Sequence, residues 1–233
     1  MSYIILNGVK NTSIQGLTIQ TLPSISKPQI RTSIETIDGR DGDIVTKLGY
    51  SSYDKPVLIG LHGNFNIDEV IEYFNSEGTV TFSDEPDKYY KYQIFDRINF
   101  DRIIRYRQAT VSLHVQPFKY SLLEGNTEYP IKNGSEIQIN NSGNIFSKPT
   151  LTLTGTGTCG VYLNNTQAFS IALGVNDTIT IDTEAMEAYK GTTLKNRAVT
   201  GSYDKFYLPV GNNVIRFSGN VTLCSIKNYS RWI

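Results

Sequence analysis

The sequence predicts a mainly β protein with one α-helix, divided into two domains. Short apolar runs bounded by glycine, asparagine or proline recur along the chain, whereas helical periodicity is clear over residues 67–77. The composition changes over residues 121–148, where Ser, Glu, Gly, Asn and Lys replace aromatic strands. We therefore expect an N-terminal β-sandwich or sheet domain with one packed helix over residues 1–128. A C-terminal β-sandwich should follow over residues 129–233, and its last strand can return to the first domain.

The first strands surround a long arm. Tyr3–Leu6 and Leu17–Thr21 are short apolar runs separated by turn residues, which predicts a hairpin. Residues 31–54 alternate only weakly and carry three glycines, so we interpret them as a long arm or loop with some strand character. Residues 56–61 form a nearly continuous apolar run, which predicts a strand buried on both faces.

The helix is expected from Ile67 to Glu77. Asn66 is a suitable N-cap, with Glu69 three residues later as in a capping box. Ile67, Val70, Ile71 and Phe74 recur at helical spacing, so one apolar stripe should face the core. Asn75 and Gly78 should end the helix, with Gly78 in the left-handed cap conformation.

Strands should follow the helix up to Pro117. Thr79–Phe82 is the first, and residues 83–87 form a turn rich in Asp and Pro. Tyr89–Phe100 and Ala109–Val115 should be long strands, the second with alternating apolar and polar residues. Pro117 should end the last strand because proline cannot donate to a ladder.

The second half shows strand signals at spacings of about 8–12 residues, the pattern of a β-sandwich or jelly roll. The domain junction is expected near residues 125–130. The predicted strands are Ile137–Ile139, Thr150–Leu153, Gly160–Leu163, Ala168–Leu173, Thr178–Ile181, Lys205–Leu208, Asn213–Phe217 and Val221–Ile226. The predicted turns carry Gly155, Gly157, Asn164–Asn165 and Gly211–Asn213.

Composition and charge exclude several classes of protein. The formal net charge is +0, which argues against a surface that binds nucleic acid without sequence preference. No segment approaches the roughly 20 apolar residues of a membrane span, and the N-terminus lacks the pattern of a signal peptide. The protein should then be made in the cytosol, where Cys159 and Cys224 would be reduced. Both lie in strand-like runs and are expected to be buried small hydrophobes.

One stretch is rich in arginine. Arg97, Arg102, Arg105 and Arg107 are interleaved with acidic and aromatic residues. Two interpretations remain open: a strand pair with solvated charges, or a subunit interface, where arginine and tyrosine are enriched.

No motif predicts a metal, a cofactor or a catalytic group. His62 and His114 lie in different strands, without partners at the spacing of a metal site or a triad. The cluster of Asp38, Asp41 and Asp43 lacks the calcium-loop spacing, because Gly49 stands where the terminal Glu should be. We expect a solvated loop there.

Two further functions were weighed for the second half. A glycan-binding module would present surface aromatics, and the chain has 15 Tyr but one Trp, Trp232. It would act as a monomer that recognises a host cell-surface glycan. A β-sandwich hydrolase would need paired carboxylates; Asp182, Glu184 and Glu187 form the densest acidic group, but they should lie in a turn or short helix.

The order of these segments resembles the distal tail protein of long-tailed bacteriophages, the hub of the siphovirus tail tip. In the first half the similar pieces are the loop Gly39–Gly42, the strand 56–61, the helix, residues 87–90 and the segment 115–120. In the second half they are residues 141–144, 148–151, 155–157 and 208–213 and the ending Arg231–Trp232.

The resemblance implies a structural role and a partner set. Family members assemble as rings, commonly hexamers, through the N-terminal domain, and carry a galectin-like C-terminal sandwich. The ring joins the tail tube protein on one face and the tail-associated hub, fibre or receptor-binding protein on the other. This chain would then be a non-enzymatic component of the virion tail tip, without cofactor. A glycine-hinged arm could pair with a neighbour's sheet edge. We therefore predict that Gly39, Arg40, Asp41, Gly42 and Asp43 lie at or beside the subunit interface.

Overall fold

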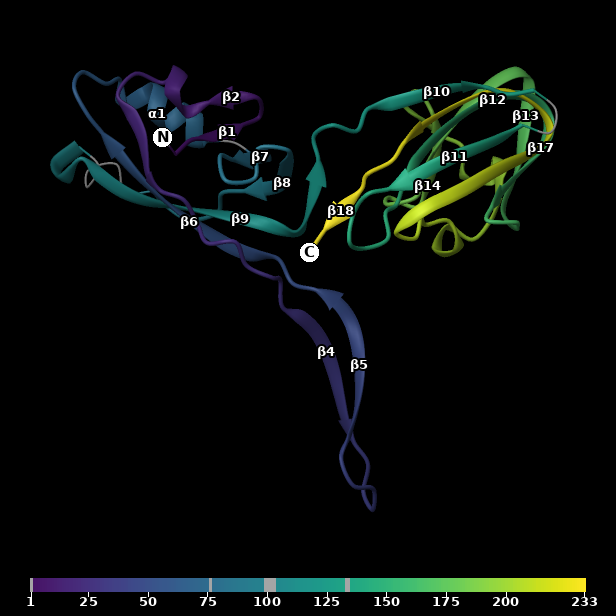
Figure 1. The fold of residues 1–233 in the computed structure, drawn as a ribbon, viewed down its shortest axis with the longest axis horizontal. Helices are drawn as coiled ribbons and strands as arrows, with labels where there is room; N and C mark the ends of the chain where they lie inside the picture. Colours follow the sequence, from purple (N-terminus) through teal and green to yellow (C-terminus); the bar gives the residue numbers. More distant parts are fainter. Residues whose placement is uncertain (1, 76, 99–103, 133–134) are drawn as a thin grey trace. The chain divides into compact units, whose positions relative to one another are not determined.

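The computed structural model describes residues 2–75, 77–98, 104–132 and 135–233 and is mainly β, as the sequence predicts. The chain divides into two compact units (Figure 1). The first comprises residues 1–120 with Ile233, and the second comprises Ser121–Trp232. Each unit has its own cluster of buried apolar side chains.

One sheet forms the body of the first unit. Its strands are β1 (Ile4–Leu6), β2 (Val9–Lys10), β3 (Leu17–Thr21), β6 (Tyr53–Leu61), β7 (Gly78–Phe82), β8 (Lys88–Gln93) and β9 (Gln108–Ser121). They lie in the order β2-β1-β7-β8-β9-β6-β3, and the 3-10 helix η1 (Asn11–Ser13) follows β2. The pairs β1–β2, β1–β7, β3–β6, β6–β9 and β7–β8 are antiparallel.

The hairpin predicted between the first two apolar runs does not form. Ile4–Leu6 pairs with Val9–Lys10 and with β7, whereas Leu17–Thr21 pairs with β6. The two runs therefore stand near opposite edges of the sheet. Asn7 and Gly8 turn the chain into the very short β2, and a sequence pattern does not show which distant strand each run will join.

The strand expected at residues 56–61 is part of the longer β6. It is not buried on both faces throughout, because Val57, Ile59 and Leu61 are buried while Leu58 is half-buried and Pro56 is exposed. The alternation follows from the pleat, which sends successive side chains to opposite faces. The prediction of a strand is confirmed, and its two-sided burial is wrong for the first half of the segment.

Helix α1 (Ile67–Phe74) confirms the predicted start but ends three residues early. The Asn66 side chain accepts a hydrogen bond from the Asp68 N–H at 3.0 Å, which caps the helix. The helix ends at Asn75, and Gly78 is the first residue of β7 rather than a helix cap, with a φ of 142°. A Cβ at Gly78 would lie 2.0 Å from the Asn7 Oδ1, so close approach explains this glycine.

The buried face of α1 also differs from the predicted stripe. Val70, Tyr73 and Phe74 are buried, while Ile67 and Ile71 are half-buried. The Tyr73 hydroxyl donates to the Ile4 and Val9 carbonyl oxygens, which allows its polar end to enter the core. Burial raises the pKa of the Tyr73 hydroxyl.

Strands β8 and β9 differ in length from the strands that the sequence predicted. The strand expected over Tyr89–Phe100 is β8, which ends at Gln93; residues 99 and 100 lie outside the described residues. Strand β9 continues through Pro117 to Ser121. Its ladder with β6 ends at the Tyr53–Val115 pair, so the missing N–H of Pro117 costs no hydrogen bond to β6.

Residues 31–54 contain a separate hairpin. Strands β4 (Ile30–Thr36) and β5 (Asp43–Tyr50) pair with each other in a sheet of their own. The expected strand character is confirmed, but the arm ends at Tyr50, because Tyr53 and Asp54 belong to β6. We call residues 30–50 the arm.

The second unit is a curled sheet around a closed core (Figure 1). Its strands are β10 (Asn126–Pro130), β11 (Glu136–Asn141), β12 (Thr150–Leu163), β13 (Thr166–Asp182), β14 (Glu187–Lys190), β15 (Thr193–Leu194), β16 (Val199–Gly201) and β17 (Gly211–Lys227). The short strand β18 (Arg231–Trp232) is not part of this sheet. The main order is β10-β17-β12-β13-β14-β15, with β11 on β17 and β16 on β13. The 3-10 helices η2 (Asn196–Ala198) and η3 (Tyr203–Lys205) lie between β15 and β17.

Several predicted short strands are parts of long strands. The expected pairs of strands at 150–153 and 160–163, 168–173 and 178–181, and 213–217 and 221–226 belong to β12, β13 and β17 respectively. Gly155 and Gly157 flank a register shift instead of a turn. A bulge of this kind bends a strand without ending it. The sequence shows the bend as a glycine pair but does not distinguish it from a turn.

Other predictions for this unit had mixed outcomes. Asn164–Asn165 form the predicted two-residue turn, with φ of 46° and 71°, between the paired Leu163 and Thr166. Gly211–Asn213, expected as a turn, begin β17. Lys205–Leu208 is not a strand: its apolar alternation reflects Phe206 and Leu208, which are fully buried after η3.

The cap of α1 gives a first test. We predict that Asn66→Ala lowers the free energy of unfolding by about 1 kcal/mol, because one amide at the start of the helix loses its acceptor. Urea unfolding of the whole chain measures this change. Asn64→Ala, at an exposed position of the same loop, is the matched control. An equal loss in both variants would contradict the capping role.

Candidate functional site

The arm exposes apolar side chains that no part of its own hairpin covers. Ile34 and Val45 are cross-strand partners and are 61% and 57% exposed. Ile37 and Leu48 are also exposed. An isolated pair of strands is at best marginally stable in water, so such an arm gains stability from a covering surface.

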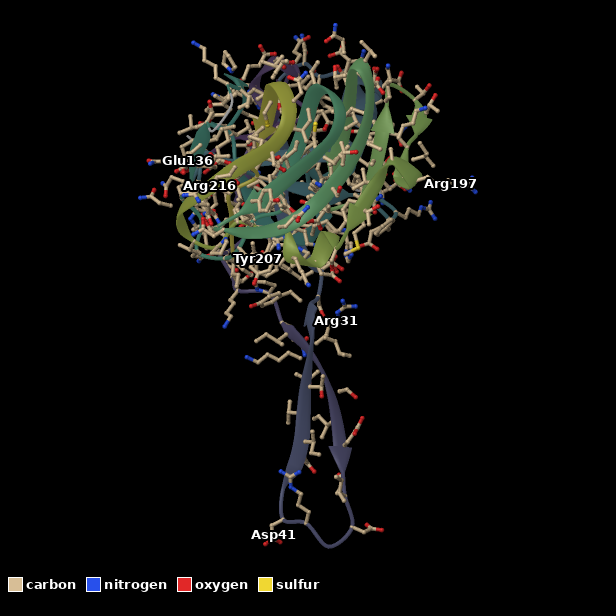
Figure 2. The ribbon with its side chains drawn as sticks, turned by 90° about the vertical axis from the view of Figure 1, so that its right-hand side faces the viewer. Arg31, Asp41, Glu136, Arg197, Tyr207 and Arg216 are labelled. Carbon is tan, nitrogen blue, oxygen red and sulfur yellow. The ribbon has the colours of Figure 1, made fainter. Side chains whose placement is uncertain are left out.

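Backbone turns shape the tip of the arm (Figure 2). The Arg40 N–H donates to the Ile37 carbonyl at 3.2 Å, and Gly39 and Gly42 have φ of 80° and 78°. These left-handed conformations favour glycine. The Thr36 hydroxyl donates to the Asp43 carboxylate at 3.0 Å across the end of the ladder. The five predicted interface residues thus lie together at the tip, where all are exposed.

The root of the arm is fixed to the body of the first unit. The Ser51 N–H donates to the Gln29 carbonyl at 2.8 Å and extends the pairing past Ile30 and Tyr50. The Tyr50 ring packs edge-on against Phe118 of β9, with centroids 5.5 Å apart. These contacts hold both strands at the base while the shaft and tip stay exposed.

A buried lysine anchors the segment that leads into the arm. Lys55 in β6 is 2% exposed, and its ammonium donates to the Ser24 carbonyl at 3.0 Å. The same ammonium lies 5.0 Å from the Tyr90 ring centroid and 5.4 Å from that of Phe82. The Tyr53 hydroxyl donates to the Ser26 carbonyl at 3.4 Å. Sequence reasoning missed this anchor, since Lys55 looks like an exposed residue before an apolar run.

Charges around Lys55 partly compensate its burial. Desolvation lowers the pKa of the Lys55 ammonium, and the nearby Glu85 carboxylate opposes that shift. Glu85 also forms an ion pair with Lys119 and accepts a hydrogen bond from the Tyr90 hydroxyl. Burial, with the neighbouring Tyr53 and Glu85, raises the pKa of the Tyr90 hydroxyl. The network therefore favours an un-ionised Tyr90.

A groove lies beside the C-terminal end of α1. It has a volume of about 400 Å³ and is lined by Ile71, Phe74, Asn75, Glu77, Gln93, Ile94, Phe95, Asp96 and Ile98. Phe95 is 69% exposed, although its ring packs 5.2 Å from that of His114. Two carboxylates line this groove, and the described lining contains no lysine or arginine.

The arginine-rich stretch is exposed where it is described. Arg97, Arg105 and Arg107 are exposed, and Arg102 lies outside the described residues. The Arg107 guanidinium stacks 4.6 Å from the Phe65 ring centroid, and the Arg107 carbonyl accepts a hydrogen bond from the Leu61 N–H. Arg107 has a φ of 59°. Where they are described, residues 94–98 and 104–107 are not strands, so the interpretation as a strand pair does not hold for them, whereas their solvated charges are confirmed.

The structure pairs one histidine with an acid that the sequence did not connect. His114 Nδ1 lies 2.7 Å from an Asp54 carboxylate oxygen, across the β6–β9 ladder. The Asp54 side chain is 61% exposed. His62 is exposed and lies apart from this pair in the sequence and in the sheet. Among the described residues, no group of His, Cys, Asp and Glu could hold a metal ion.

The acidic group of the second unit lies in a turn. Asp182 ends β13, and its carboxylate accepts the Glu184 and Ala185 N–H groups at 2.9 Å. This arrangement is an Asx-type turn, consistent with the prediction of a turn or short helix. Glu187 is the first residue of β14 and pairs with Asp182.

An aromatic pair is exposed on the second unit. Phe146 and Tyr207 pack edge-on with centroids 5.1 Å apart, and both remain partly accessible. The buried Arg231 guanidinium stacks 4.6 Å from the Phe146 centroid, and its Nε donates to the Phe146 carbonyl. Glu184 lies 3.6 Å from the Arg231 guanidinium. This pair was not identified from the sequence, because the two aromatics are far apart along the chain.

The structure shows the environment of both cysteines and whether its helices could span a membrane. Cys159 and Cys224 are buried free thiols, and burial raises the pKa of both, so neither favours the reactive thiolate. In the parts of the chain that the structure describes, no helix is long and apolar enough to cross a membrane.

Solved structures of phage hub and baseplate proteins share this fold. The crystal structure of the SPP1 Dit protein, a hub of the adsorption apparatus in phages of Gram-positive bacteria, matches with a TM-score of 0.67 and 16% identity. That match covers 98% of this chain and 99% of the other. No protein-family model and no curated protein matches the chain.

Two structures of the phage P2 baseplate in its activated conformation also match. The structure with Ca has a TM-score of 0.52 at 13% identity and covers 98% of this chain and 97% of the baseplate chain. The structure with Sr has a TM-score of 0.51 at 14% identity and covers 97% and 96%. The fold expected from the resemblance is therefore confirmed: the chain has a phage hub-like fold.

The exposure of the arm predicts its hydrogen exchange. In dilute protein, amides of β4 and β5 should exchange much faster than those of β6 and β9, because both faces of the arm meet water. Hydrogen-exchange mass spectrometry of peptides from each strand measures the difference. Arm amides protected as strongly as the β6–β9 ladder in monomeric protein would show that the arm is stable without a covering partner.

Proposed function

We propose that this chain is a structural hub of a bacteriophage tail tip or baseplate that assembles into a ring through its arm. The observation that carries the proposal is the arm itself, with Ile34 and Val45 exposed on a hairpin that has no third strand. The phage hub-like fold supports it, because the matched structures are a tail hub and a baseplate. The role is structural and not enzymatic.

Ring closure requires a heterologous contact, in which two different surfaces of each copy meet. The arm supplies one such surface, and its fixed root sets the direction of the shaft. The predicted interface residues Gly39–Asp43 occupy the tip, where contacts to a neighbour can form without disturbing the body. A hexamer is the ring size that the resemblance implies.

The ring would connect two sets of tail proteins. We propose that one face binds the tail tube protein and the other binds the tail-associated hub, fibre or receptor-binding protein. The second unit would be a galectin-like sandwich that can carry receptor-binding proteins. The protein would therefore be located at the virion tail tip.

Removing the outer arm tests this function. A variant that lacks residues 36–46 should stay monomeric, because it loses the tip and part of the exposed apolar shaft. Its thermal unfolding should change little, since the arm contributes no residue to the two buried clusters. Light scattering during size exclusion gives the mass of each sample.

The control for this deletion is Val175→Ser, which alters an exposed apolar residue on the second unit. It should assemble as the unmodified protein does. If the deleted variant forms rings of the same mass as the unmodified protein, the arm is not the assembly element.

The exposed Phe146–Tyr207 pair favours a second candidate function. A half-exposed aromatic pair, held in place by Arg231, is a surface on which a sugar ring could stack. In this alternative the chain is a monomeric module that recognises host cell-surface glycan.

A glycan array followed by titration calorimetry separates the two functions. The glycan function predicts micromolar-to-millimolar binding that Tyr207→Ala abolishes, with Tyr162→Ala on β12 as the control. The hub function predicts rings whose mass Tyr207→Ala leaves unchanged. Absence of glycan binding by the unmodified protein would remove the alternative.

A further inference from the structure

We propose that the arm of one copy docks in the groove beside α1 of the next copy. In this arrangement the Ile34–Val45 pair covers Ile71, Ile94 and Phe95, and the acidic tip meets Arg105 and Arg107. The inference rests on the proposed ring and names the surface that receives the arm.

The groove has a partly exposed apolar lining. Ile71, Ile94 and Ile98 are half-buried, Phe74 is buried, and Phe95 is largely exposed. Exposed apolar surface beside a polar rim commonly marks an interaction site. The arm carries the matching feature, because Ile34 and Val45 stand side by side on one face of a narrow hairpin.

The charges of the arm follow a fixed order along β5. Lys47, Val45 and Asp43 alternate with other residues, so the pleat places all three on the same face. Towards the tip that face is basic, then apolar, then acidic. Asp41 extends the acidic end, at the tip marked in Figure 2.

The receiving surface carries charges of both signs. Glu77 and Asp96 line the groove together with its apolar side chains, whereas Arg105 and Arg107 are exposed outside it, and Arg107 stacks on Phe65 ahead of α1. Lys47 would then face the two carboxylates while Asp41 faces the arginines. Complementary charge fixes the direction in which two surfaces meet and disfavours the reverse orientation.

The basic and apolar parts of the receiving surface lie at opposite ends of α1. Arg107 stacks on Phe65, which precedes the start of α1, whereas the groove adjoins the end of that helix. Eight helical residues span about 12 Å. On the arm, the two strand steps from Val45 to Asp43 span roughly 7 Å, and the turn that carries Asp41 lies beyond them. An arm seated in the groove would direct its tip along α1 toward the arginines.

The arm and the surface that would receive it lie at opposite ends of strand β6. The arm enters β6 at Tyr53, whereas the Arg107 carbonyl accepts the N–H of Leu61, the last residue of β6. Eight residue steps of a strand separate these ends by roughly 26 Å. Two different surfaces at opposite ends of a subunit join copies head to tail, and such contacts form a ring when the rotation from copy to copy closes.

Disulfide trapping tests the contact in the full chain. A variant with Val45→Cys and Phe95→Cys should form a ladder of linked copies under oxidising conditions, because both positions are exposed and would meet between neighbours. Native Cys159 and Cys224 are buried and should not react. The matched control carries Val45→Cys and Leu194→Cys, whose second position is exposed on the other unit.

A charge exchange provides an independent readout. Asp41→Arg with Asp43→Arg should weaken assembly at least about tenfold, as should Arg105→Asp with Arg107→Asp, because like charges would meet. The chain with all four substitutions should recover assembly. Sedimentation at several concentrations measures each dissociation constant.

The outcomes separate this inference from the proposed function. Unmodified protein that forms no ring overturns both. Rings that need residues 36–46 but give no ladder with the Val45–Phe95 pair, or no recovery in the fourfold variant, overturn the docking site and leave the hub function standing. A ladder specific to that pair, with recovery, supports both.

Discussion

One physical constraint stands out: the arm exposes apolar side chains and strand edges that its own hairpin leaves uncovered. Among the described residues, its two strands form a sheet of their own, and the Ile34–Val45 pair meets water. A two-stranded ribbon buries too little surface to offset the entropy of ordering its backbone. The groove beside α1 likewise leaves apolar side chains partly exposed on the body of the first unit. The contact between copies that we propose would cover both.

The body of the first unit is built to hold the arm in place. Lys55 is buried at a cost in desolvation, which its hydrogen bond to Ser24 and the ring faces of Phe82 and Tyr90 offset. Tyr53 and Tyr50 add contacts on either side of the root. A buried cation needs a defined geometry, so this network fixes the path of residues 24–26 more narrowly than apolar packing alone would. Assembly through a long arm requires such a fixed root.

Local patterns in the sequence predicted much of the fold. The cap at Asn66, the turn at Asn164–Asn165 and the strand character of the arm depend on neighbouring residues, and the structure confirms them. Pairing between distant strands was not predictable in the same way. The partner of Leu17–Thr21 is β6, and no local feature distinguishes it from Tyr3–Leu6.

The candidate site was likewise predictable only where it depends on residues that are neighbours in the sequence. The exposed tip Gly39–Asp43 was recognisable from its glycines and charges. Three other features depend on which strands and loops become neighbours: buried Lys55, the Asp54–His114 pair and the groove. Lys55 was also unexpected because buried side chains are normally apolar. In the second unit the glycines led to a wrong prediction of a turn, because Gly155 and Gly157 flank a bulge within β12.

The central claim is that this chain assembles with itself through the arm. Its most direct test is the mass of the purified protein by light scattering over a range of concentrations, with negative-stain images of the same fractions. The account predicts closed rings of about six copies, with a hole at the centre. A monomer at every concentration would contradict it.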